Sequence, residues 1–279
     1  PSDDANLLHR AAYHRGVACG LIHPEDDLSP LKVLYVPHWV MWKPEWTPRV
    51  AAFVAAGGTL ILSAMTGTRD IDNHIHRELA PGAGLAQLAG VRVEEFGRLA
   101  APGATGLGMT LPERFPGAYA DPTPPPSSSA LRKQHFTLGN RLFETGHLYE
   151  KLLPEAGTEV LGTWSDRWLE GQPMATRRAH GKGQVIYLGT YLTPELAEQV
   201  VETICIPAGA KPLLPELPAG VEVTVRQAQD RALWFILNTQ AGPTLVPSIP
   251  KGRDLLSGRA VGGEGLHLGP YGCAVIRPE

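Results

Sequence analysis

The chain has 279 residues, of which 43% are hydrophobic and 19% charged, which fits one domain of about 200 residues plus a small second one and excludes global disorder. Its formal net charge is -3, and like charges form no block. This charge pattern gives no electrostatic basis for binding nucleic acid or an anionic membrane surface, so we expect neither as a partner.

Cysteine usage and hydropathy exclude further classes. Cys19, Cys205 and Cys273 show no CxxC spacing, so we expect no structural zinc site and no disulfide framework. No run reaches the roughly 18 to 20 uncharged apolar residues that span a bilayer, and the N-terminus lacks the pattern of a signal peptide. We therefore predict a cytoplasmic protein that needs no cofactor or metal and does not bind a membrane.

Helices and apolar strands alternate in the first part of the chain. In order, the expected elements are a helix over 2–15, β runs over 17–22 and 32–37, a helix capped by Thr47 and ended by Gly57, and a strand over 59–63. Short connections between helices and apolar strands are typical of a parallel sheet covered by helices on both faces. The sequence therefore predicts a doubly wound α/β domain.

Further elements continue the same pattern. They are a helix over 84–89, strands over 91–96, 159–164 and 185–189, and a helix over 193–206. The Gly-Lys-Gly run at 181–183 lies between β runs over 174–178 and 184–188, which favours a hairpin turn over a phosphate-binding loop. Proline and serine dominate 112–129, which we interpret as a surface loop.

The C-terminal part shows only strand patterns. A proline-rich stretch from 208 to 218 indicates a linker, and the strands are expected over 221–226, 233–238, 244–246 and 266–276. We predict two domains, an α/β domain over 1–210 and a small antiparallel all-β domain over 211–279.

Catalytic motifs are missing where this fold class would carry them. The sequence contains neither GxGxxG after a strand nor GxxxxGK[ST]. Class I glutamine amidotransferases place a nucleophilic cysteine at a sharp turn after a central strand, but here that turn holds Ser63, Ala64 and Met65. No GxSxG motif surrounds Ser63, so we expect an ordinary turn residue there rather than a nucleophile.

The densest polar run covers 66–76, outside the carboxyl end of the strand over 59–63, where open α/β sheets bind ligands. His74 and His76, with Asp70 or Asp72, offer metal-ligand atoms, but the spacing is not HxxxH. We interpret the run as a solvated or interface loop. Its best candidates for contact with a neighbouring subunit or the rim of an active site are Arg69, Asp70, Asp72 and Asn73.

Three tryptophans, Trp39, Trp42 and Trp46, crowd one short segment. Aromatic faces suit the apolar faces of sugar rings, and they also pack in cores and subunit contacts, so the sequence leaves both interpretations open. A stand-alone carbohydrate-binding protein using this cluster is the alternative function.

Two sets of sequence blocks resemble parts of one enzyme family. The first set lies at 53–60, 66–73, 90–96, 159–164, 171–177, 181–183 and 187–190. The second set is Asn238 with the segments 252–256 and 269–276. The first set is similar to the middle domain, and the second to the C-terminal β domain, of glycoside hydrolase family 42 β-galactosidases. The blocks occur in the family's order and cover nearly the whole chain.

The resemblance implies a flavodoxin-like, class I glutamine amidotransferase-like domain that has lost its nucleophile and serves trimerisation. It also implies that relatives carry two catalytic glutamates on a TIM barrel that this chain lacks, and that they hydrolyse terminal β-galactosides with retention. We therefore expect an inactive assembly portion whose partners are further copies of the chain, as a homo-oligomer and most simply a trimer, and a separate catalytic TIM-barrel segment. Relatives have a strand before the first helix, and we expect that strand to be missing here.

Overall fold

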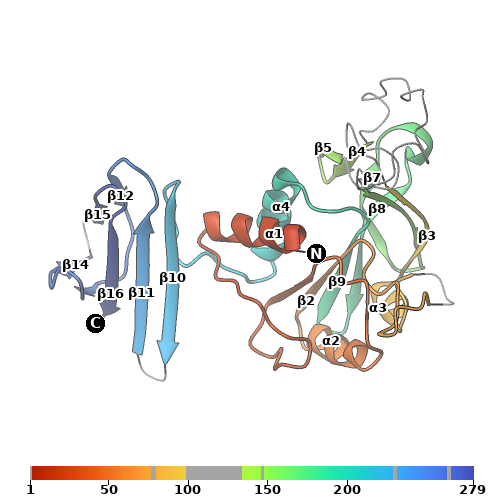
Figure 1. Ribbon diagram of the computed structural model, residues 1–279, viewed down its shortest axis with the longest axis horizontal. Coiled ribbons are helices and arrows are strands. Elements are labelled where there is room, and N and C mark those ends of the chain that lie inside the picture. The colour runs from red at the N-terminus through yellow and green to blue at the C-terminus, as the bar shows by residue number, and fades with distance from the viewer. Residues whose placement is uncertain (1, 77–79, 99–133, 146–147, 229–230, 263–264) are drawn as a thin grey trace, which may run out of the picture. The chain divides into compact units, whose positions relative to one another are not determined.

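The computed structural model describes residues 2–76, 80–98, 134–145, 148–228, 231–262 and 265–279. It divides into two compact units, one formed by Asp27–Thr193 and the other by Ser2–Asp26 together with Pro194–Glu279 (Figure 1). Each unit is described by itself. The proline-rich and serine-rich segment 112–129 lies outside the described residues, so its prediction as a surface loop stays a prediction.

A mixed sheet of seven described strands forms the centre of the first unit, in the order β1-β2-β9-β8-β7-β4-β5. Its strands are β1 (Val33–Val36), β2 (Thr59–Ser63), β4 (Gln134–Leu138), β5 (Arg141–Thr145), β7 (Glu159–Trp164), β8 (Pro173–His180) and β9 (Gly183–Leu188). β1, β2 and β9 are parallel to one another, and the remaining neighbours pair antiparallel. The sheet is therefore mixed, and the predicted parallel arrangement holds only for β1, β2 and β9.

Residue type and pairing together explain this mixed architecture. Every side chain of β2 is buried, as expected for an apolar strand with a parallel neighbour on each side. β8 and β9 are joined by the two-residue turn Gly181-Lys182, with His180 opposite Gly183, so the predicted hairpin is confirmed. A turn this short can join only antiparallel strands, and the sheet changes direction at this point.

Two helices pack against this sheet. They are α2 (Trp46–Ala55), which contacts β2, β8 and β9, and α3 (Leu85–Ala89), which contacts β3, β8 and β9 (Figure 1). The prediction that Thr47 caps α2 is wrong, because the residue before the helix is Glu45, whose side chain makes no capping bond. The Thr47 hydroxyl instead donates to the carbonyl of Ala83 and accepts the indole N–H of Trp42.

A two-stranded antiparallel ribbon completes the first unit. It pairs β3 (Val91–Arg98) with β6 (Leu148–Pro154) and contains an irregularity between Val93 and Glu95. A short 3₁₀ helix, η3 (Arg167–Leu169), follows β7. The strand at β3 was predicted from the sequence, whereas β4, β5 and β6 were not.

The second unit contains the helices at the start of each of its two segments. α1 (Ser2–His14) contacts α4 (Pro194–Val200) and the π-helical turn η4 (Val201–Cys205), and Arg15 forms ion pairs with Glu198 and Glu202 across this contact. The strand predicted over 17–22 is wrong, because the segment makes only a single bridge from Val17 to Pro212. In the described part of the chain, no helix is long and apolar enough to cross a bilayer.

An antiparallel β-structure forms the rest of the second unit. One sheet has the order β10-β11-β16-β13-β14, and β12 pairs with β15. The strands are β10 (Val221–Ala228), β11 (Arg231–Asn238), β12 (Thr244–Val246), β13 (Gly252–Asp254), β14 (Ala260–Val261), β15 (Leu266–Leu268) and β16 (Cys273–Pro278). Their core includes Val221, Val223, Ile236 and Ile276. The predicted strand over 266–276 is divided by a turn at Gly269–Gly272.

Candidate functional site

The candidate site begins at the turn that follows β2. Met65 has a φ of 65°, a left-handed conformation uncommon for a residue with a side chain. Ser63 is fully buried at the end of β2, so its hydroxyl lies in the core. The interpretation of Ser63 as a turn residue rather than a nucleophile fits this burial, because a nucleophile must reach its substrate.

A buried acid lies beneath this turn. Glu150 of β6 is fully buried, and its carboxyl accepts the backbone N–H of Met65 at 2.9 Å and the hydroxyl of Tyr187 at 2.9 Å. Burial raises the pKa of Glu150 to about 7 from the usual 4.5, although both hydrogen bonds favour the ionised form. The same burial raises the pKa of Tyr187 well above its usual range.

The alternation of residues around Glu150 in the sequence indicates that this acid is buried. Glu150 stands between Leu148 and Leu152, two residues from each, and alternate residues of a strand share a face. Both leucines are buried, so the strand pattern places the glutamate on the core face of β6. We predicted no element there, and therefore no buried acid.

The loop 66–76 brings together the candidate contact residues. Arg69 bridges to Met41 on one side and to Ile75 on the other, and its guanidinium donates to the carbonyl of Asn73 at 2.9 Å. The backbone N–H of Gly67 also bonds the carbonyl of Trp39. The loop is therefore an ordered hydrogen-bonded structure, in which Asp72 and Asn73 are exposed at the tip and Arg69 is half-buried.

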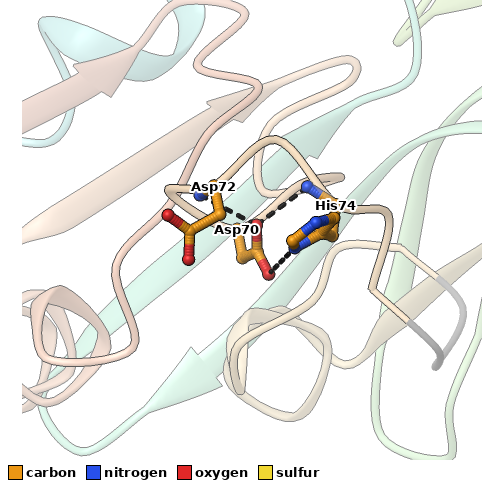
Figure 2. Close-up of side chains that lie close together, drawn as sticks. All are labelled: Asp70, Asp72 and His74. Carbon is orange, nitrogen blue, oxygen red and sulfur yellow. Dashed lines mark hydrogen bonds and ion pairs between the residues drawn. The ribbon is translucent and has the colours of Figure 1, made fainter.

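Asp70 organises the tip of this loop. One of its carboxylate oxygens accepts the backbone N–H groups of Asp72 at 3.0 Å and His74 at 2.8 Å, and the other lies 3.4 Å from Nδ1 of His74 (Figure 2). These contacts, above all the backbone N–H of His74, lower the pKa of Asp70. The carboxylate therefore serves first as a brace for the loop.

Three potential metal ligands meet at the same point. Ligand atoms of Asp70, Asp72 and His74 lie within 4.8 Å of one another. His76 does not belong to this group, so the structure does not combine the two histidines into one site. Because the Asp70 carboxylate already bonds the loop backbone and the other two side chains are exposed, the contacts support loop bracing and do not require a cation.

The tryptophan cluster is mainly a packing unit. Trp42 and Trp46 are buried and meet edge to face with ring centroids 5.4 Å apart, and the indole N–H of Trp42 is bonded to Thr47. Trp39 packs against Trp46 at 6.4 Å but is 41% exposed. Of the three rings, Trp39 alone presents a substantial surface to solvent.

Exposed apolar side chains surround the same loop. Ile71 is 55% exposed and Ile75 is 71% exposed, and Met41, which bridges to Arg69, is also exposed. With Trp39, these are the exposed large apolar side chains of the loop and of the segment that its backbone bonds, and we call them the loop patch, defined as Trp39, Met41, Ile71 and Ile75. Neighbouring large apolar side chains on a surface mark interaction sites more often than isolated ones do.

Comparison with known proteins identifies the family. The family model described as the β-galactosidase trimerisation domain matches residues 2–109 and 127–210. The chain belongs to this family. A second model, the β-galactosidase C-terminal domain, matches residues 220–278, so the trimerisation domain and the C-terminal domain together account for most of the chain. The resemblance predicted from separate blocks of sequence is confirmed.

The relatives are longer proteins. The β-galactosidase of an Arthrobacter species is 30% identical over 266 residues, which cover 92% of this chain and 33% of that protein. β-Galactosidase BgaB of a Geobacillus species is 26% identical over 277 residues, covering 96% of this chain and 36% of that protein. The chain thus spans about a third of the length of these relatives.

Solved structures confirm the fold. The β-galactosidase from Bacillus circulans sp. alkalophilus matches with a TM-score of 0.83 at 24% identity, over 100% of this chain and 37% of that one. α-L-Fucosidase isoenzyme 2 from Paenibacillus thiaminolyticus also matches, with a TM-score of 0.60 at 16% identity, over 99% of this chain and 45% of that one. The fold is therefore shared with a protein named for another sugar, and it does not define a substrate by itself.

Proposed function

We propose that the chain is the non-catalytic assembly portion of a β-galactosidase, an enzyme that hydrolyses terminal non-reducing β-D-galactose residues. The observation that carries this proposal is the match of two adjacent family models to almost the whole chain, while the chain spans only about a third of its relatives. The catalytic glutamates then belong to a TIM-barrel segment outside this sequence, and the chain alone is inactive.

The proposed partners are two further copies of the chain and that catalytic segment. The loop patch supports a subunit contact, because exposed isoleucines flank the polar residues at the tip of an ordered loop. An apolar centre with a polar rim is the usual composition of a protein interface. In this proposal Ile71 and Ile75 are buried by the neighbouring subunit, and Arg69, Asp70, Asp72 and Asn73 form the rim.

Charged substitutions in the loop patch test this contact. Replacing both isoleucines, Ile71→Asp with Ile75→Asp, is expected to dissociate the assembly, because burying an isoleucine contributes about 1.5–3 kcal/mol and each 1.4 kcal/mol changes affinity about tenfold. Sedimentation velocity measures the shift towards the monomer. Leu142→Asp on β5 is the matched control, because Leu142 is similarly exposed but is not part of the patch. An assembly equally stable in both variants would place the contact elsewhere.

The finer structural assignments also belong to this proposal. The parallel strands β1, β2 and β9, with the turn at Met65, support descent from a flavodoxin-like, amidotransferase-like domain in which the nucleophile position is occupied by non-catalytic residues. We also propose domain boundaries at 1–210 and 211–279, supported by family models that end at 210 and begin at 220. These boundaries follow the sequence families, whereas the two compact units divide the chain after Asp26 and after Thr193.

Sugar binding at Trp39 is the second candidate function. The exposed ring of Trp39 supports it, whereas Trp42 and Trp46 are buried. Titration with galactose is expected to change tryptophan fluorescence in a saturable way, and Trp39→Ala is expected to abolish that change. Absence of a saturable change in the unaltered chain would reject this function and leave the assembly proposal intact.

A further inference from the structure

A buried carboxyl connects the core to the loop that carries the loop patch. Glu150 is held from its backbone as well as its side chain: its N–H bonds the carbonyl of Gly189 at 2.8 Å, and its carbonyl accepts the indole N–H of Trp164 at 3.0 Å. With the backbone fixed in this way, its carboxyl is directed at the N–H of Met65 and the hydroxyl of Tyr187.

We propose that Glu150 is a proton-dependent latch, whose neutral carboxyl holds the turn at Met65 closed and whose ionisation loosens that turn together with the loop 66–76. The carboxyl satisfies the N–H of a residue in a left-handed conformation, which a neighbouring group must stabilise. When the turn opens, water reaches the carboxyl. The ionised acid gains most from this hydration, so its ionisation favours opening.

The surroundings of the carboxyl explain why its neutral form is favoured. Its side-chain bonds in the described structure are those to Met65 and Tyr187, and neither donor carries a charge. Burial also keeps Tyr187 protonated and neutral by raising its pKa, so its hydroxyl donates a hydrogen bond to the carboxyl without adding a charge. Both hydrogen bonds lower the pKa of the carboxyl, but burial without a neighbouring charge outweighs them and raises this pKa to about 7.

Charged groups on the adjoining strands bond elsewhere. On β3, Glu94 forms an ion pair with Lys151 at 2.6 Å. Glu95 accepts the hydroxyl of Tyr149 at 2.7 Å. On β8, Arg177 and Arg178 form contacts with Glu159 and Glu155, respectively.

One histidine lies on the other side of the turn. His38 contacts the carbonyl of Ala64 through Nδ1 at 3.2 Å and the hydroxyl of Tyr191 through Nε2 at 3.2 Å. One of its contacts is with Ala64, the residue before Met65, so His38 is a competing source of a pH effect at this turn. A variant at Glu150 distinguishes the two groups.

Backbone hydrogen bonds connect the turn at Met65 to the loop that follows it. The N–H of Gly67 bonds the carbonyl of Trp39, and the N–H of Arg69 bonds the carbonyl of Val40. These bonds follow the turn directly and connect it to the segment that carries Trp39 and Met41 of the loop patch. Loss of the latch is therefore expected to reduce protection of all amides from Met65 to Arg69, rather than of Met65 alone.

Hydrogen exchange of the full chain tests the latch. At each pH the exchange of amides 65–69 is divided by the intrinsic rate of the unstructured sequence, which gives the opening equilibrium. With carboxyl pKa values of about 7 closed and 4.5 open, opening is expected to increase about twentyfold between pH 5.5 and 7.5. Glu150→Gln, which keeps an acceptor for the Met65 N–H and cannot ionise, is expected to remove this increase.

Glu170→Gln is the matched control, because Glu170 is exposed and follows β7 on the same unit. It should show the twentyfold increase of the unaltered chain. An equal pH effect in the Glu150→Gln variant would overturn the proposal and assign the effect to another group such as His38. A direct carbon-13 measurement of the Glu150 carboxyl needs no variant, and a midpoint near 4.5 rather than about 7 would also overturn it.

Discussion

At the scale of single residues, the buried acid Glu150 couples the stability of the protein to pH. Its carboxyl is buried with two neutral donors, and its pKa of about 7 lies above the value of 4.5 expected in the unfolded chain. Between these two values the folded state binds a proton that the unfolded state releases. The contribution of Glu150 to stability therefore falls as pH rises through this window and levels off above about 7.

We predict that the free energy of unfolding falls by about 3 kcal/mol between pH 4.5 and 7, since a difference of about 2.5 pKa units at 1.36 kcal/mol each gives this amount. Urea denaturation across this pH range measures it. The Glu150→Gln variant should lack this decrease, so its free energy of unfolding relative to that of the unaltered chain should increase as pH rises. A stability that increases with pH over this window, with the same slope in both proteins, would contradict the assignment.

Residues of the loop 66–76 and of the tryptophan cluster show what can and cannot be predicted from sequence. Composition and position after a buried strand predict a solvated or interface loop at 66–76, and the structure has an ordered, hydrogen-bonded loop at that position. The burial of Trp42 could not be separated from sugar stacking, because both use the same apolar ring. The role of Thr47 also depended on tertiary contacts, since its hydroxyl bonds Trp42 and Ala83 rather than its own helix.

At the scale of elements, the β8–β9 hairpin depends on glycine at two places. Gly181 has a φ of 59° and approaches the backbone of Ala55, and a Cβ on Gly183 would collide with the carbonyl oxygens of Gly58 and Val54. The turn therefore lies directly against the C-terminal end of α2. Glycine is required there for close packing of two backbones, which agrees with a structural turn and not a phosphate-binding loop.

We predict that Gly183→Ala destabilises the chain by about 1–3 kcal/mol, the usual cost of forcing extra volume into a packed region. Thermal or urea unfolding measures this loss. Gly242→Ala is the control, because nothing lies within 4 Å of the position of its added Cβ, and its effect should be within about 0.5 kcal/mol. If the two variants were equally stable, the close approach at Gly183 would have no energetic role.

Most long elements were predictable from periodicity, whereas pairing direction was not. β2, β7, β10 and β11 lie where apolar patterns placed them. β4, β5 and β6 were missed, and the sheet is mixed because hairpins such as β8–β9 reverse the chain within it. The run 17–22 is apolar enough for a strand but has only one bridging partner and is mostly exposed, so apolar composition alone does not predict its structure.

At the scale of the whole molecule, the family assignment and the loop patch lead to the same expectation. In the proposed assembly, the exposed isoleucines on the ordered loop are covered by a partner surface, which identical copies arranged with cyclic symmetry can supply. Loss of the patch should then act on assembly without unfolding the chain, because Ile71 and Ile75 are exposed in the single chain.

The mass of the full chain in solution tests the central claim most directly. Sedimentation equilibrium over a range of concentrations should give a species of about 90 kDa, three copies of the 30.0 kDa chain. In the variant with aspartate substituted for both Ile71 and Ile75, the measured mass should fall towards that of the monomer. A chain that remains a 30.0 kDa monomer throughout that range would contradict the account that this sequence is itself an assembly portion.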